Sequence, residues 1–523
     1  MTYTYDNASR REAMVDPDGG RSTYLYDNAS RLTSLLNPFT ERTTWAYHAA
    51  GRATTVTLAN GTRTTTGYDD ASQVTAIRHS KSDDTQVAKY EYSYNDAGVR
   101  TSVLEGSGDR VTWSYDNAWR LTREQRSGDN AYDITYCYDP VGSRATKLTG
   151  GVTTTYSYNA GDAVTGADAG GTLTTYSWDD AGNNTVVNAN GTLTTYTWDG
   201  ENRLKTIQTA SGTITLAYDA GGLRRTRQDA STTRKFVWEF QSLLLETDGD
   251  GTTVAQYTGA LDTYGPVVSQ RRSSTSRFYH PSVLGTIETL TGADAATTDT
   301  YILDAWGVQH AATGSTVNPF RYVGALGYYT EPDLALAYVR ARWLRPATGS
   351  WLSVDPVEGE ARYGYVGGSA TAATDASGRH HGAFNFGDIP GPRPAPPPIP
   401  APSGGSGTGG GGWVAGPPCT TPASPGVADE AAGGAAGVIG GGWGQEITKR
   451  QIVEACIAEG RSREWCLKFA KLFKGKTCGA LWRWCIHLGM GKTPVSRHHA
   501  EMCLSVHHTL CGPAPDCTPV GGL

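Results

Sequence analysis

Short segments in which apolar and polar residues alternate recur along the first three hundred residues. In the segments 172–178 (TLTTYSW) and 192–198 (TLTTYTW), threonines and aromatic residues follow a period of two, which predicts strands with one buried face. The polar segment 179–183 (DDAGN) follows the first of them, and Asp, Asn and Gly favour tight turns. An Asn-Gly pair at 190–191 is a strong hairpin signal. Each such unit therefore predicts two antiparallel strands and two turns.

An aromatic-acidic unit repeats eleven times at steps of 20 to 26 residues. Clear copies are YDNASRL at 26–32, YDNAWRL at 115–121 and WDGENRL at 198–204. A single Tyr-Asp pair has two interpretations, an acid–base site or a turn anchored by an aromatic ring. Eleven copies favour the anchored turn, and consecutive hairpins predict one long antiparallel sheet whose edges need cover. The leading aromatics are Tyr5, Tyr26, Tyr47, Tyr68, Tyr94, Tyr115, Tyr138, Tyr158, Trp178, Trp198 and Tyr218.

Composition narrows the class of protein. Apolar residues make up 38% of the chain and charged residues 18%, which is low for a standard α/β enzyme or a helical bundle. No run of about 18 apolar residues occurs, so no membrane span is predicted. The opening residues MTYTYD lack the basic and apolar regions of a signal peptide. Because the chain begins inside a repeat, we expect a fragment of a longer protein.

The Y-D-x-x-G-R-L units resemble the YD repeats of the RHS family, which includes bacterial wall-associated toxins, the shell subunits of insecticidal toxin complexes, and teneurins. The segment 318–356 (NPFRYVGALGYYTEPDLALAYVRARWLRPATGSWLSVDP) is similar to the family's repeat-associated core. The resemblance implies an all-β fold in which the antiparallel sheet of hairpins spirals into a β-cocoon. With eleven units, we expect a partial and open shell.

The same resemblance implies an aspartyl-type self-cleaving centre in the core. Its motif positions correspond to Arg342, Asp355 and Asp375, and cleavage is expected close to Arg379 and His380. Two close carboxylates share a proton, so one serves as general acid while the other activates water. This sequence departs from the family pattern, with DPVEG at the first aspartate and DASG at the second. The alternative is that both aspartates only cap turns.

The resemblance and the composition together divide the chain into four parts. We expect a repeat shell over 1–317, the repeat-associated core over 318–378, a linker over 379–445 and a C-terminal module over 446–523. The linker contains 19 Gly and 12 Pro, which predicts disorder. The module has short apolar stripes at helical spacing, so we expect a small α-helical domain.

The C-terminal module carries the remaining candidate chemistry. Its cysteines predict a disulfide framework, and the alternative is a zinc site that uses Cys503, Cys511 and His507 or His508. Its charge, 11 Lys and Arg against 6 Asp and Glu, allows a nuclease-like effector with histidine acid–base groups, or simply a solvated histidine-rich face. The disulfide candidates are Cys456, Cys466, Cys478, Cys485, Cys503, Cys511 and Cys517, and the histidine candidates are His498, His499, His507 and His508.

Three functions remain open at this stage. The first is a secreted or surface RHS shell that carries or partly encloses its own C-terminal module, with no enzymatic activity beyond self-cleavage. The second is a polymorphic toxin with a nuclease-like tail, which would require an immunity protein. The third is an adhesion surface for glycans on a neighbouring cell. Further RHS repeats upstream are expected as structural partners, and neither a cofactor nor a metal ion is predicted.

Overall fold

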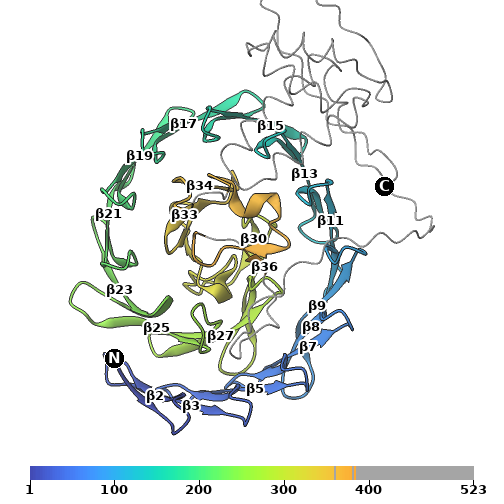
Figure 1. The fold of residues 1–523 in the computed structure, drawn as a ribbon, viewed down its shortest axis with the longest axis vertical. Coiled ribbons are helices and arrows are strands. Elements are labelled where there is room, and N and C mark those ends of the chain that lie inside the picture. Colours follow the sequence, from blue (N-terminus) through green and yellow to red (C-terminus); the bar gives the residue numbers. More distant parts are fainter. Residues whose placement is uncertain (358–360, 380–381, 384–523) are drawn as a thin grey trace, which may run out of the picture. The chain divides into compact units, whose positions relative to one another are not determined.

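The computed structural model describes residues 1–357, 361–379 and 382–383. Its main feature is a 30-stranded antiparallel sheet in which each strand pairs with the next along the chain. The sheet curls into a spiral around a small central subdomain (Figure 1). The predicted all-β spiral of hairpins is therefore confirmed for this part of the chain, whereas the predicted helices of 446–523 lie outside the described residues.

The strands of the outer wall are β1 (Thr2–Tyr5), β2 (Arg11–Val15), β3 (Arg21–Tyr26), β4 (Leu32–Leu36), β5 (Arg42–Tyr47), β6 (Ala53–Thr57), β7 (Arg63–Tyr68), β8 (Val74–Ser80), β9 (Gln86–Tyr94), β10 (Arg100–Glu105), β11 (Arg110–Tyr115), β12 (Leu121–Arg126), β13 (Tyr132–Tyr138), β14 (Arg144–Thr149), β15 (Val152–Tyr158), β16 (Val164–Ala169), β17 (Thr172–Trp178), β18 (Asn184–Ala189), β19 (Thr192–Trp198), β20 (Leu204–Thr209), β21 (Gly212–Tyr218), β22 (Arg224–Gln228), β23 (Thr233–Glu239) and β24 (Ser242–Thr247). The sheet continues inward through β25 (Thr253–Gly259), β26 (Val267–Arg272), β27 (Thr275–Pro281), β28 (Ile287–Thr291), β29 (Thr297–Leu303) and β30 (Gln309–Thr313).

One hydrogen bond per repeat connects each hairpin to the preceding one. The leading aromatic of a hairpin lies at a β-bulge, opposite a residue whose carbonyl is turned out of the regular ladder. The next leading aromatic donates its O–H or N–H to that carbonyl, as Tyr47 does to Leu32. All these bonds measure 2.5–2.8 Å, and they join Tyr26 to Arg11, Tyr47 to Leu32, Tyr68 to Ala53, Tyr94 to Val74, Tyr115 to Arg100, Tyr138 to Leu121, Tyr158 to Arg144, Trp178 to Val164, Trp198 to Asn184, Tyr218 to Leu204 and Trp238 to Arg224.

The residue after each leading aromatic closes the turn, and it is Asp in eight of the eleven units, with His48, Asn95 and Asn159 in the others. In the turn at Asp116, its Oδ1 accepts the backbone N–H groups of Ala118 and Arg120 at 2.9 and 3.0 Å. The Arg120 guanidinium returns to the same carboxylate and lies 4.7 Å from the ring of Tyr138 in the next repeat. The repeat motif therefore encodes a capped turn, a bulge and a contact with the following hairpin.

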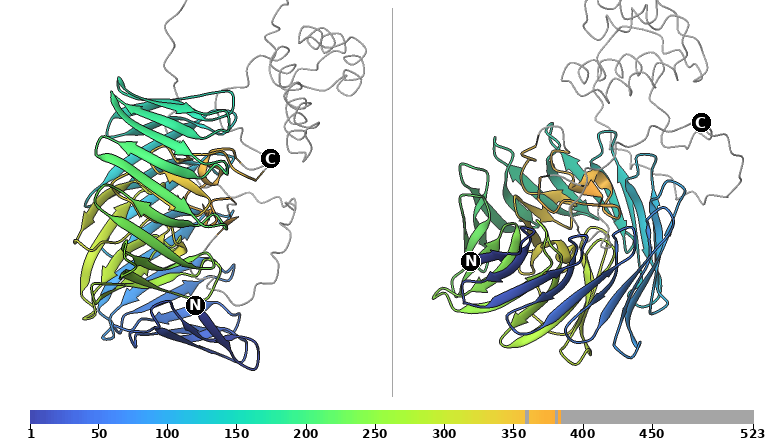
Figure 2. Two further views of the ribbon diagram at one scale, coloured as in Figure 1. Left: turned by 90° about the vertical axis from the view of Figure 1, so that its left-hand side faces the viewer. Right: turned by 60° about the horizontal axis from the view of Figure 1, so that its bottom comes forward.

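The last six strands of the sheet pass inside the first strands and form a second layer (Figures 1 and 2). Polar side chains join the layers: Gln256 donates to Asp16 at 2.8 Å and Asn60 to Thr291 at 2.9 Å. A continuous apolar core also spans both layers and includes Trp45 and Phe278. The inner strands thus cover part of the outer wall's inner face.

The centre of the spiral is filled by the segment after β30. It contains the 3₁₀ turns η1 (Gly324–Leu326) and η2 (Tyr365–Gly368), a four-stranded sheet and a two-stranded one. Main-chain bonding continues from the wall into this centre, because Asn184 N–H donates to the Leu352 carbonyl at 2.8 Å. The strands of these sheets are β31 (Tyr329–Glu331), β32 (Leu336–Val339), β33 (Arg342–Arg345), β34 (Ser350–Trp351), β35 (Ala373–Thr374) and β36 (Gly382–Ala383).

Buried arginines fix the central subdomain to the wall. Arg224, with 0% of its surface exposed, forms an ion pair with Glu331 and lies 4.2 Å from the ring of Phe236. Two hairpins earlier along the same wall, Arg345 donates to Asn184 at 3.0 Å. A buried guanidinium needs a polar partner, either a carboxylate or a carbonyl oxygen, and it also needs packing against apolar groups. These sites supply both kinds of contact.

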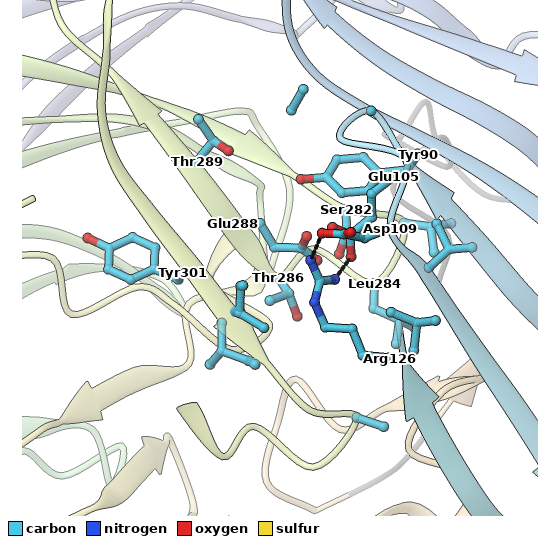
Figure 3. Close-up of a pocket in the computed structure, with 18 of the residues that line it drawn as sticks. Tyr90, Glu105, Asp109, Arg126, Ser282, Leu284, Thr286, Glu288, Thr289 and Tyr301 are labelled. Atoms are coloured by element: carbon cyan, nitrogen blue, oxygen red, sulfur yellow. Dashed lines mark hydrogen bonds and ion pairs between the residues drawn. The ribbon is translucent and has the colours of Figure 1, made fainter. Parts of the chain in front are cut away.

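A cavity of about 510 Å³ lies between the outer strands and the inner layer. Figure 3 shows Arg126 on one side of it, bound to Glu105 and Asp109, and Glu288 from the inner layer close by. Burial, and next the charge of Glu105, raise the pKa of the Glu288 carboxyl to about 8. The side chains of Tyr90 and Ser282 donate to it and partly oppose this shift.

We expect Tyr47→Phe to lower the free energy of unfolding by about 1 kcal/mol, because it removes one part-buried hydrogen bond and keeps the ring. Urea unfolding followed by tryptophan fluorescence measures this change. Tyr5→Phe is the matched control, since Tyr5 is 58% exposed and its hydroxyl group makes no hydrogen bond within the described part of the chain. Equal effects of the two substitutions would contradict the role given to the inter-repeat bond.

The cavity carboxyl gives the shell a predictable pH dependence. Between pH 4.5 and about 8 the folded state keeps the Glu288 proton that the unfolded chain loses, so this group's contribution to stability falls as pH rises through that range. The free energy of unfolding of the wild type should therefore decrease with pH relative to that of Glu288→Gln. Unfolding curves of the two proteins at several pH values test this, and parallel pH profiles would refute it.

Candidate self-cleavage site

The three residues predicted for self-cleavage meet in the central subdomain. Arg342 begins β33, and its Nη2 lies 2.6 Å from Asp355 Oδ2 and 3.0 Å from Asp375 Oδ2. All three side chains are at most 5% exposed. The Arg342 guanidinium also lies 4.2 Å from the ring of Trp351. One cation therefore joins two carboxylates that are 20 residues apart in the sequence.

Each aspartate also closes its own turn, with its other oxygen. Asp355 Oδ1 accepts the Val357 N–H at 2.9 Å. Asp375 Oδ1 accepts the Ser377 hydroxyl and the Arg379 N–H, both at 3.0 Å. The two interpretations of these residues, turn cap and carboxylate pair, are thus geometrically compatible, and the catalytic role stays a prediction.

The charged groups of the site influence one another's protonation. Burial, and next the charge of Asp375, raise the pKa of the Asp355 carboxyl, while the Val357 N–H and Arg342 oppose this shift. Burial lowers the pKa of the Arg342 guanidinium, against the effect of the two carboxylates. A carboxylate with a raised pKa is a stronger base towards water.

Gly378 brings a backbone carbonyl to the same arginine. Arg342 Nε donates to the Gly378 carbonyl, and Gly378 has a φ of +70°. A Cβ at this position would lie 2.2 Å from the Val339 carbonyl oxygen, so only glycine fits. The carbonyl of the Gly378–Arg379 peptide bond is therefore held against the guanidinium that holds both aspartates.

Three residues of this site were not predicted from the sequence. Arg340 donates to the Ala376 carbonyl, and the Tyr328 hydroxyl accepts the Asp375 N–H at 2.8 Å, so both position the second turn. Ser377 contacts the second aspartate directly. Arg340 lies in the R-A-R-W run and Ser377 in the DASG element, but no residue pattern predicted their contacts.

The other sequence candidates are not placed at this site. His380 and the C-terminal histidines and cysteines named above lie outside the described residues. Within the described ranges, no group of three or more His, Cys, Asp or Glu residues is arranged to hold a metal ion. No helix among those residues has the length and apolar character needed to cross a membrane.

Comparison with known proteins identifies the repeat. The family model of the RHS repeat matches residues 26–64 and 47–83, which cover the bulges and inter-repeat bonds of β3 to β8. Residues 26–83 of the chain therefore consist of RHS repeats. The chain's described part is an RHS-repeat shell with a subdomain inside.

Two curated proteins match over 121 residues at 30% identity. They are the tRNA3(Ser)-specific nuclease WapA of Bacillus spizizenii and the tRNA nuclease WapA of Bacillus subtilis. The match covers 23% of this chain and only 5% of each relative. Their activity as nucleases therefore belongs to those much longer proteins.

A solved structure shares the fold. A Tc holotoxin pore of Photorhabdus luminescens, which carries a substitution in its TccC3 component, aligns with a TM-score of 0.55 at 16% identity. The alignment covers 72% of this RHS chain and 21% of the solved chain. At this identity the likeness establishes the architecture of the RHS shell.

Proposed function

We propose that this RHS chain is a toxin-associated shell, of a secreted or surface protein, that cleaves its own backbone between Gly378 and Arg379. Cleavage separates the shell and core, 1–378, from the C-terminal residues 379–523. One observation carries the proposal: Arg342 contacts Asp355, Asp375 and the Gly378 carbonyl at once. These contacts support the proposal, because two carboxylates and a guanidinium lie beside one peptide bond.

The chemistry follows from these contacts. Two carboxylates that share one guanidinium hold a single proton between them in the reactive state. Asp355 takes a proton from water, and the resulting hydroxide attacks the Gly378 carbonyl carbon. Arg342 Nε stabilises the negative charge that develops on the carbonyl oxygen. Asp375, which already contacts the Arg379 nitrogen, is on the side of the leaving amine.

We expect the purified chain to contain two fragments, 1–378 and 379–523, in place of one species of 55.7 kDa. Asp355→Asn should slow cleavage by at least about 100-fold, because it removes the base. The matched control is Asp248→Asn, since Asp248 caps a shell turn through the N–H groups of Asp250 and Thr252. Intact-mass spectrometry reads all three proteins, and a single uncut wild-type species would refute self-cleavage.

A second candidate function concerns the released segment. The WapA relatives are named as tRNA nucleases, and residues 446–523 carry an excess of five positive charges. We propose that this segment is a nuclease-like effector, for which the producing cell needs an immunity protein. The glycan-binding alternative has no comparable support.

Expression of residues 379–523 in a bacterial cytoplasm should arrest growth if the segment is an effector. His499→Ala or His508→Ala should relieve the arrest if these histidines supply the acid–base groups. His487→Ala is the matched control within the same segment, and tRNA integrity on denaturing gels identifies the target. Normal growth with intact tRNA would contradict the nuclease function.

A further inference from the structure

Both ends of the Gly378–Arg379 peptide group are contacted in the structure. The carbonyl oxygen accepts from Arg342 Nε. The amide N–H of Arg379 donates to Asp375 Oδ1 and to Ser377 Oγ, each at 3.0 Å. The Ser377 hydroxyl in turn donates to Asp375 Oδ1 at 3.0 Å. The serine oxygen therefore lies between the aspartate and the nitrogen of the bond proposed to break.

This arrangement modifies a turn that the shell uses repeatedly. In the shell turn at Asp116, the carboxylate accepts N–H groups two and four residues later, and the residue two positions later is Ala118. In the central subdomain Asp375 also accepts the N–H group four residues later, that of Arg379, and the Ser377 hydroxyl accepts the same N–H group. Arg342 also donates to the carbonyl oxygen of Gly378, the residue just before Arg379. These two additions supply what an otherwise inert turn lacks for hydrolysis.

A leaving amide nitrogen needs a proton as its bond to carbon breaks. A hydroxyl group donates and accepts at the same time, and its hydrogen rotates freely. Ser377 Oγ already accepts from the nitrogen and donates to the carboxylate, so both bonds can reverse once the nitrogen becomes tetrahedral and turns its lone pair towards Oγ. We propose that Ser377 is a catalytic residue that relays a proton from Asp375 to the Arg379 nitrogen during self-cleavage.

The relay rests on the self-cleavage proposed above, and its protons balance. In the reactive state the carboxyl pair holds one proton, and the relay requires that this proton lie on Asp375. Water gives a proton to Asp355 and adds its hydroxyl to the Gly378 carbon. As the C–N bond breaks, Ser377 gives its proton to the Arg379 nitrogen and takes the proton of Asp375. The products are a carboxylic acid at Gly378, an amine at Arg379 and a pair that again holds one proton.

The test measures cleavage rates of the full chain over a range of pH. The chain is synthesised in a cell-free system with labelled methionine. A translation inhibitor then starts the chase at each pH. Gels measure the fraction of chain that remains intact over time. Ser377→Ala should slow cleavage by about 100-fold, and the loss of rate on the alkaline side, which reports a general acid, should disappear. Ser377→Thr keeps the hydroxyl and should stay within about tenfold of the wild type.

Two further variants separate chemistry from folding. Ser377→Cys keeps the side-chain shape but is a weak donor and acceptor, so it should show the same loss as Ser377→Ala while folding normally. Ser231→Ala is the matched control, because Ser231 Oγ donates to Asp229 Oδ1 at 2.9 Å in a shell turn. It should cleave at the wild-type rate.

The outcomes distinguish the relay from self-cleavage itself. Wild-type cleavage together with unchanged rate and pH profile in Ser377→Ala and Ser377→Cys would overturn the relay and leave self-cleavage standing. A wild-type chain that stays intact at every pH would overturn both. Slow variants that lack the alkaline fall in rate, rescued by Ser377→Thr, support the relay.

Discussion

The architecture depends on a hydrogen bond between the aromatic tip of one repeat and a backbone carbonyl of the repeat before it. The carbonyl is available because the leading aromatic of its own hairpin creates a bulge, which turns one peptide group out of the ladder. A buried carbonyl without a partner is costly, so each bulge requires the next hairpin's O–H or N–H. Tyr and Trp combine such a donor with a large apolar face. This explains why each leading position is occupied by Tyr or Trp and why Trp178 and Trp198 replace Tyr without changing the bond.

A bulge repeated in every hairpin also bends the sheet in a constant direction. The wall therefore curls, and after one circuit its later strands meet its first strands as a second layer. The layers then bury apolar faces against each other, together with polar pairs such as Gln256 and Asp16. The central subdomain fills the remaining space, fixed by guanidinium groups with aromatic neighbours. Local bulge geometry thereby determines where a distant segment is buried.

The candidate cleavage site reuses the local chemistry of the shell. Its aspartates close turns as the repeat aspartates do, but Arg342 gathers them at one point, away from solvent. Burial there strengthens each electrostatic contact and keeps a glycine carbonyl in a fixed orientation. A turn that closes the hairpins of the shell thus acquires, in the central subdomain, contacts with one arginine and one serine hydroxyl.

The sequence by itself determined the period of the repeat, the strand and turn order of each unit, and the positions of the aromatic anchors through Tyr218. Its resemblance to the RHS core also indicated Arg342, Asp355 and Asp375. The sequence did not show that Trp238 continues the inter-repeat bonds, since Glu239 and Phe240 follow it in place of the usual Asp-containing turn. Nor did it show the second layer, the raised pKa of the Glu288 carboxyl or the contacts of Ser377. These features arise between residues far apart in the sequence or from side-chain orientation, and only the tertiary structure decides which groups share a buried space.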